Sequence, residues 1–319
     1  MSFNHSVIGP PVFLLTGFPG LEKHHIWLSI PVCSVYLVAI AGNCTILFII
    51  KKDQALHEPM YYFLSMLALS DLGLSITTLP TMLSVLWLNH RVIHFSACLI
   101  QMYFIHTLSI AESGILLAMA FDRLVAIRNP LRYMTILTNK TIIKIGVGVA
   151  IRAAFLVFPA SFLLKRLHYG TKNVLSYSFC VHQDIMKAAR SDRRISSIYG
   201  LVVMLSSTAV DSLLLVLSYF LILKTVLGVA SKEERFKALS TCVSHISAVL
   251  SFYIPMLGLT MIHRYGKHAP PILYILIANT YLLVPPLMNP IVYSVKTKQI
   301  RTRIILKLQK REKTIKASW

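Results

Sequence analysis

The chain has 319 residues, of which 55% are hydrophobic and only 14% are charged. Soluble globular domains usually carry about 25% charged residues, so this composition excludes an ordinary soluble domain and favours a lipid environment. The net charge of +20 does not indicate nucleic-acid binding, because the Lys and Arg residues flank apolar segments and no aromatic stacking platform accompanies them.

Long apolar segments follow one another along the chain. A helix that crosses the hydrocarbon core needs about 20 apolar residues. Seven runs meet this requirement, near residues 26–50, 59–86, 98–122, 141–164, 197–223, 238–262 and 271–294. They predict an all-α membrane protein with a single domain. It comprises an extracellular N-terminus over 1–25, a seven-helix transmembrane bundle over 26–295 and a cytoplasmic tail over 296–319, which begins with a short amphipathic helix.

The distribution of basic residues predicts the orientation of these spans. The short loops on one side of the bundle, together with the tail, carry roughly twice as many Lys and Arg as the other side, which marks that side as cytoplasmic. The sequence therefore predicts a multi-pass protein of the plasma membrane with its N-terminus outside. Membrane lipids are its expected surroundings, and the basic residues attract anionic head groups.

Two cysteines and one asparagine carry the chemistry expected of the outer face. Cys98 begins the third span and Cys180 lies in the long outer loop, so both meet an oxidising compartment and are predicted to form a disulfide. Asn4 opens an N-x-Ser acceptor on the outer tail and is the predicted glycosylation site. The other three cysteines are interpreted as small buried apolar side chains: Cys33, Cys44 and Cys242.

Ionisable residues inside the spans form a predicted mid-membrane network. Asp71 in the second span and Glu112 in the third reach similar depths, and Asn43 and Asn289 are expected to join them. Two facing carboxylates require a cation or a proton between them, which predicts a possible Na⁺ as the only cofactor. The alternative is a neutral hydrogen-bonded pair of acids that holds the helices together.

Two basic side chains lie in the outer half of the bundle. His106 is expected either to hydrogen-bond between helices or to contact a ligand. Arg264 follows His263 at the outer end of the sixth span, where it either extends to the interface or binds an anion. No enzyme is predicted, because the chain has no HExxH, GxSxG or phosphate-binding glycine loop, and its histidines lack metal-ligand spacing.

Five motifs, taken in chain order, resemble those of the odorant-receptor family over nearly the whole length. They are Leu56-His57-Glu58-Pro59-Met60-Tyr61-Tyr62 before Asp71, Met119-Ala120-Phe121-Asp122-Arg123, Ser218-Tyr219, Lys237-Ala238-Leu239-Ser240-Thr241-Cys242-Val243-Ser244-His245, and Asn289-Pro290-Ile291-Val292-Tyr293-Ser294. The paired tyrosines, Phe121 and the long outer loop look like the class I, fish-like branch of rhodopsin-like G-protein-coupled receptors.

The resemblance implies a receptor for a small-molecule odorant, coupled to a heterotrimeric G protein of the olfactory stimulatory type that raises cAMP. Class I members are associated with polar ligands, particularly carboxylic acids. The matching pocket positions are His106, Gln183, Thr260 and Arg264. An Arg guanidinium suits a carboxylate because it can donate two parallel hydrogen bonds.

The resemblance also implies a route for activation. Pro255 frees a helix carbonyl, so the sixth span can bend there, and Tyr253 is expected to sense the ligand close to this bend. The expected switch residues on the cytoplasmic side are Asp122, Arg123, Tyr219 and Tyr293. Ligand binding would then shift the population toward an open cytoplasmic cleft.

The chain departs from the family pattern at two places. Leu124 and Arg128 replace a Tyr and a Cys, which puts the efficiency of coupling in doubt. Gly170 and Arg190 align with a second cysteine pair, which predicts a looser outer loop. Two other functions stay open at this point: a chemosensory receptor in a non-olfactory tissue, and an ion transporter or channel lined by Asp71 and Glu112.

Overall fold

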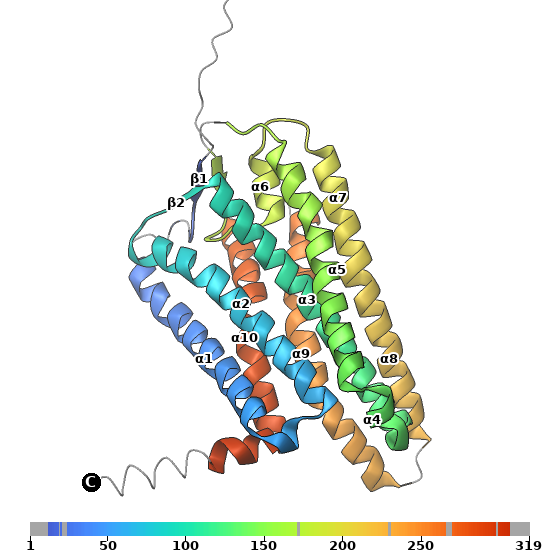
Figure 1. The fold of residues 1–319 in the computed structure, drawn as a ribbon. Coiled ribbons are helices and arrows are strands. Elements are labelled where there is room, and N and C mark those ends of the chain that lie inside the picture. Colours follow the sequence, from blue (N-terminus) through green and yellow to red (C-terminus); the bar gives the residue numbers. More distant parts are fainter. Residues whose placement is uncertain are drawn as a thin grey trace, which may run out of the picture.

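The computed structural model describes residues 12–18, 20, 24–170, 173–228, 231–265, 270–297 and 299–306. Within them, seven helical segments are long and apolar enough to cross a membrane, and Figure 1 shows them packed side by side as one bundle. The first four are α1 (His25–Lys52), α2 (Pro59–Trp87), α3 (Phe95–Arg128) and α5 (Asn139–Lys165). The last three are the α7–η4–α8 column (Arg194–Met204, Leu205–Ala209 and Val210–Leu227), α9 (Lys232–Tyr265) and α10 (Pro271–Lys296).

The seven predicted spans are confirmed, and the helices run slightly further than their apolar cores. The helix α3 extends three residues before and six residues after the predicted 98–122. Hydropathy marks only the part of a helix that lies in hydrocarbon, whereas the backbone hydrogen bonds continue into the polar interface. Short segments connect the spans: η2 (Gln54–Leu56), η3 (Pro130–Arg132), α4 (Tyr133–Ile136) and α6 (His182–Ala188).

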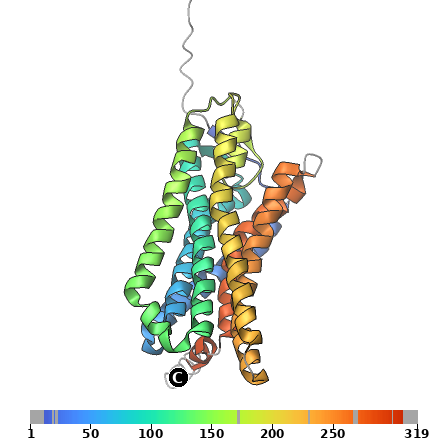
Figure 2. The ribbon, with the colours of Figure 1, turned by 90° about the vertical axis from the view of Figure 1, so that its right-hand side faces the viewer.

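The fifth span contains a π-helical turn, η4. Figure 2 shows α7, η4 and α8 as one continuous column beside α5. A π turn inserts an extra residue into the helix and is common at functional sites. Here it carries Ser207 and Thr208, which line the cavity described below.

The contact between α1 and α10 follows from one proline. Pro290 has no N–H to donate to the carbonyl of Pro286, one turn earlier in α10. The side chain of Asn43 supplies the missing donor at 3.0 Å. Gly42 makes this approach possible, because a Cβ there would lie only 2.7 Å from the Cβ of Pro290.

The predicted helix after the seventh span is present over residues 299–306. Ile300 is fully buried against the inner core of the bundle, and Arg303 forms an ion pair with Asp53 at the start of η2. This division into an apolar face and a basic face is typical of a helix lying along a membrane surface.

A three-stranded sheet covers part of the outer end of the bundle, and the sequence analysis did not predict it. β1 (Val12–Leu15) pairs antiparallel with β2 (Val92–His94) and parallel with β3 (Asn173–Leu175). Phe13 and Leu15 are buried beneath it. The strands are too short to show a periodic pattern, so only the tertiary packing specifies them.

Candidate functional site

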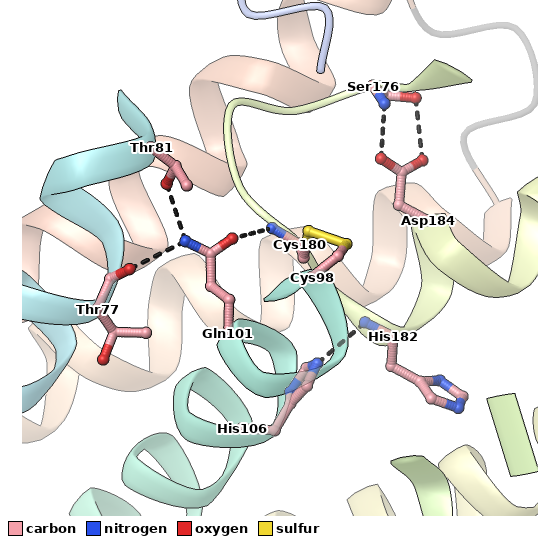
Figure 3. Close-up of a disulfide and its surroundings, with 9 residues drawn as sticks. All are labelled: Thr77, Thr81, Cys98, Gln101, His106, Ser176, Cys180, His182 and Asp184. Atoms are coloured by element: carbon pink, nitrogen blue, oxygen red, sulfur yellow. Dashed lines mark hydrogen bonds between the residues drawn. A yellow bond between two sulfur atoms is a disulfide. The ribbon is translucent and has the colours of Figure 1, made fainter. Parts of the chain in front are cut away.

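The predicted disulfide between Cys98 and Cys180 is confirmed and joins the start of α3 to the outer loop. Gln101, one turn further along α3, fixes the same loop. Its side-chain oxygen accepts the N–H of Cys180 at 2.9 Å, and its side-chain nitrogen donates to α2 at the carbonyl of Thr77 and the hydroxyl of Thr81 (Figure 3). The loop is therefore anchored to two helices at one point.

A buried carboxylate anchors the next part of the loop. Asp184 accepts hydrogen bonds from the backbone N–H and the hydroxyl of Ser176 (Figure 3). Burial raises the pKa of this carboxyl to about 6, and the two bonds from Ser176 oppose that rise. The short helix α6 is held against β3 as a result.

Gly170 and Arg190, which align with a lost cysteine pair, lie in contact. The side chain of Arg190 covers Gly170 so closely that a Cβ there would meet its Nε at 2.6 Å. The backbone N–H of Arg190 donates to the carbonyl of His168, and Tyr169 forms a β-bridge with Ala189. Backbone pairing thus joins the two segments in place of a covalent bond.

A cavity of about 120 Å³ lies beneath the anchored loop. It is lined by residues from α3, α5, α6, the α7–η4–α8 column, α9 and α10. Its polar lining consists of His106, Ser109, His182, Gln183, Ser207, Thr208, Thr260, His263 and Tyr281. This mixture of apolar walls and a few converging polar groups is typical of a small-molecule site.

His106 is positioned by the loop itself. The backbone N–H of His182 donates to its Nε2 at 3.2 Å (Figure 3). Because Nε2 accepts this bond, the proton of a neutral imidazole resides on Nδ1, which then serves as a donor. Of the two roles considered for His106, the structure shows a hydrogen bond, which links α3 to the first residue of α6, and it places the ring in the lining of the cavity.

Five residues were predicted to bind ligand, and the structure brings three of them together. His106, Gln183 and Thr260 line the cavity. Tyr253 does not belong to its described lining; its hydroxyl is hydrogen-bonded to that of Ser113 at 2.9 Å. The side chain of Arg264 lies outside the described residues, as does Asn4.

The sequence analysis missed His263 as a cavity residue. Its ring lines both the inner cavity and a second cavity of about 300 Å³ toward the outside. Its Nε2 is 2.9 Å from the hydroxyl of Tyr177 in the loop, and its Nδ1 is 2.8 Å from the carbonyl of Leu259. The His-Arg pair at the end of a span was the available signal, but only Arg264 was considered as a ligand-binding residue.

The predicted acidic network is assembled at mid-membrane. Asp71 and Glu112 are fully buried, and Asn289 donates to both oxygens of Asp71 at 3.1 and 3.3 Å. One oxygen of Glu112 and the side-chain oxygens of Asn43 and Asn289 have no hydrogen-bond partner within the described residues. These are hard oxygen donors of the type that cations such as Na⁺ prefer.

A second buried ionic network was missed entirely. Arg152 of α5 donates to both oxygens of Asp211 in α8, at 2.8 and 2.5 Å. Ser113 of α3 also donates to Asp211 and lies within hydrogen-bonding distance of Tyr253 in α9. The available signal was a basic residue in the middle of one apolar span and an acidic residue in the middle of the next. Charged residues inside membrane spans usually pair with one another and mark functional sites.

The predicted switch residues lie toward the end of the bundle opposite the disulfide. Arg123 pairs with its neighbour Asp122 at 3.3 Å, and Tyr133 donates to the same carboxylate at 2.7 Å. Tyr219 stacks on His245 and is hydrogen-bonded to it. Tyr293 is buried against Met119.

Leu124, where the resemblance leads one to expect a tyrosine, packs into an apolar contact between helices. It lies against a buried cluster of Ile222, Val226 and Cys242, contributed by α8 and α9. The substitution therefore exchanges a polar ring for hydrophobic contact with two helices beside Arg123.

The described residues contain no group of three or more His, Cys, Asp or Glu able to hold a metal ion.

The seven-helix bundle superimposes on squid rhodopsin with a TM-score of 0.74, covering 90% of this chain and 86% of that chain at 15% identity. The fold is therefore that of a rhodopsin-like receptor.

The family is shown by sequence. The sequence model described as "Olfactory receptor" matches residues 32–311. The human olfactory receptor 51G2 is 59% identical over 292 residues, covering 92% of this chain and 93% of the relative. The human olfactory receptor 51L1 is 55% identical, covering 96% and 97%. The chain belongs to the olfactory receptor family of G-protein-coupled receptors, which are not enzymes, and this membership rejects the transporter or channel interpretation.

Proposed function

We propose that this receptor recognises small odorants bearing a carboxylate. The observation that carries the proposal is the enclosed cavity in which His106, Gln183 and Thr260 converge beneath the disulfide-anchored loop. His106 Nδ1 and the Gln183 amide are hydrogen-bond donors suited to a carboxylate. Arg264 follows the cavity-lining His263 in α9 and is the proposed charged partner.

Occupancy of the cavity is proposed to act on α9. Phe252 lines the cavity and packs edge-on against Tyr253, which lies two residues before Pro255. A ligand that displaced these two side chains would change how α9 bends at Pro255. The ligand shifts the population only if it binds the activated conformation more tightly.

We propose that the activated receptor couples to the stimulatory olfactory-type G protein and raises cAMP. The coupling surface would include Arg123, released from Asp122, and Tyr219 and Tyr293 of the neighbouring helices. In the proposed orientation the C-terminal tail lies in the cytoplasm and the N-terminus lies outside. We propose that Asn4 is glycosylated there. The basic residues of the cytoplasmic loops support that orientation.

Asp71 and Glu112 are proposed to share either a Na⁺ or a proton. Asp71, Glu112, Asn43 and Asn289 would hold the cation through their oxygens, three of which have no partner in the described structure. Either occupant would neutralise the repulsion between the carboxylates.

The test is a cAMP reporter screen in cells that express the receptor with the olfactory stimulatory G protein. Straight-chain carboxylic acids are compared with alcohols and methyl esters of the same length. We expect acids to respond at concentrations at least tenfold below their esters, because the esters lack the anionic oxygens. Equal responses to acids and esters would reject the ligand class, and a response that persists without the G protein would reject the coupling.

A further inference from the structure

A third cavity, separate from the odorant cavity, opens on the lipid-facing side of the bundle. It measures about 510 Å³ and lies between α3, α5 and α8. Its walls are mostly apolar and include Phe121, Leu214 and Leu217, which are 42%, 42% and 51% exposed. In a membrane bundle, exposed apolar side chains face hydrocarbon, so an occupant enters from the bilayer.

Two glycines shape the walls of this third cavity. A Cβ added at Gly148 of α5 would meet nothing within 4 Å, so this wall borders open space. A Cβ at Gly114 of α3 would approach Val149 at 2.9 Å and Arg152 at 3.2 Å. Gly114 therefore allows α5 to lie close to α3, while Gly148 leaves room for a ligand.

The basic side chain at the end of this cavity nearest the middle of α5 is Arg152. Two of its nitrogens bind Asp211, its Nε has no hydrogen-bond partner within the described residues, and its side chain is 34% exposed. A guanidinium carries five N–H donors, so donors remain after Asp211 is bound. At this depth an unmatched donor costs free energy, which an acceptor on a ligand would recover.

The depth of Arg152 limits the class of ligand. Arg152 lies thirteen residues into α5, roughly 20 Å from the cytoplasmic end and near the middle of this span. The interface lies closer to Lys144, which lines the other end of the cavity. Phospholipids and sterols keep their polar groups at the interface, whereas a molecule dissolved in the hydrocarbon can bring an acceptor to mid-depth.

The charge of the network limits the ligand further. Arg152 and Asp211 already neutralise each other, so a carboxylate placed beside them would leave a net buried negative charge, which is costly. A ketone, aldehyde or ester offers an acceptor without charge. The cavity volume is in the range of small-molecule sites.

We propose that this third cavity binds an uncharged lipophilic carbonyl compound from the bilayer, whose carbonyl oxygen accepts a hydrogen bond from Arg152. The proposed odorant cavity selects anions, whereas an anion beside the Arg152–Asp211 pair is disfavoured. Because Arg152 is linked through Asp211 and Ser113 to Tyr253, an occupant acts on α9, the helix that contains Pro255.

The experiment measures thermal unfolding of the purified full-length receptor in lipid nanodiscs. The probes are dodecan-2-one, dodecane and dodecanoic acid, without any other ligand. We expect dodecan-2-one to raise Tm saturably by about 2–4 °C. Dodecane lacks the acceptor and dodecanoate carries the excluded charge, so neither should give this rise.

Gly148→Phe fills the space and should abolish the rise. Ala150→Phe is the matched control, because Ala150 is an exposed residue of the same helix that does not line the cavity, and it should retain the rise. Equal rises with dodecane, or a rise that survives Gly148→Phe, would overturn the proposal. So would a Gly148-dependent rise produced by cholesterol or phospholipid but not by the ketone.

Discussion

The two buried acidic networks differ in whether the chain supplies a cation. Asp211 is fully buried, yet Arg152 binds both of its oxygens. Asp71 and Glu112 are equally buried, but no Lys or Arg of the described residues forms a salt bridge with them. In a low-dielectric interior Arg152 compensates the charge of the first carboxylate, whereas no basic side chain of the described residues compensates the second pair.

This difference separates a fixed structural connection from an adjustable one. The Arg152–Asp211 pair joins α5 to α8 and continues to α3 and α9 through Ser113 and Tyr253. The charge of the Asp71–Glu112 pair depends on what the surroundings provide. The stabilisation that the Arg152–Asp211 network provides should therefore change mainly with mutation of its residues. The stabilisation that the Asp71–Glu112 network provides should change mainly with the ions in solution.

The largest expected effect is the loss of Arg152. Arg152→Met should destabilise the receptor by about 3–5 kcal/mol, because it leaves Asp211 buried without a partner. Thermal unfolding of the purified receptor measures the change. The double variant Arg152→Met with Asp211→Leu should recover most of the lost stability, and a double variant as unstable as the single one would show that the pair is not the cause.

A smaller effect is expected at Asp71. Asp71→Asn should change stability by about 1–3 kcal/mol, because it replaces a carboxylate that accepts two contacts from Asn289. If Na⁺ occupies the site, the wild type should unfold at a higher temperature in Na⁺ than in choline, and the variant should lose that difference. Equal Tm values in both salts would leave the shared proton as the occupant.

Tyr253→Phe tests the far end of the Arg152 network. The substitution removes one hydrogen bond with Ser113 and should cost about 0.5–1.5 kcal/mol. Because this bond joins α9 to α3 near Pro255, basal cAMP should also change. Phe252→Leu is the comparison, since it alters the cavity wall but keeps the bond; a normal basal signal in Tyr253→Phe would contradict the linkage.

The smallest net effect concerns two titrating groups in the outer loop. Burial raises the pKa of Asp184 to about 6 and lowers the pKa of His182 to about 4. As pH falls from 7 to 5, Asp184 therefore adds stability while His182 removes it, and each contributes on the order of 1 kcal/mol. In the wild type these two contributions oppose each other over this interval.

Two variants separate these opposing contributions. Relative to the wild-type response, acidification from pH 7 to pH 5 should shift Tm downward in Asp184→Asn, which lacks the stabilising contribution of Asp184. It should shift Tm upward in His182→Gln, which lacks the destabilising contribution of His182. The same pH response in both variants would show that neither group controls the stability of the loop.

The sequence predicted features that rest on long or local patterns. Seven apolar runs located the spans, and the two outer cysteines located the disulfide. The sheet of β1, β2 and β3 was not predictable, because three or four residues carry no periodic signal and the strands come from distant parts of the chain. Arg152 and Asp211 were overlooked because hydropathy averages a single charge away within a long apolar window.

The candidate site divides in the same way. Three residues that the resemblance assigned to the pocket, His106, Gln183 and Thr260, line one cavity in the structure. It did not foresee that the loop would hold His106 through the N–H of His182, or that His263 would lie between two cavities. Those arrangements depend on how the loop folds back after Cys180, which no local pattern specifies.

The most direct test of carboxylate recognition is the cAMP dose response of Arg264→Ala to one active acid and its methyl ester. Arg194→Ala is the control, because Arg194 is exposed at the start of α7 and does not line the cavity. Loss of a charged hydrogen bond should raise the EC50 for the acid about tenfold or more. The ester response should stay unchanged, and Arg194→Ala should alter neither dose response. An acid response undiminished in Arg264→Ala would contradict the proposed recognition.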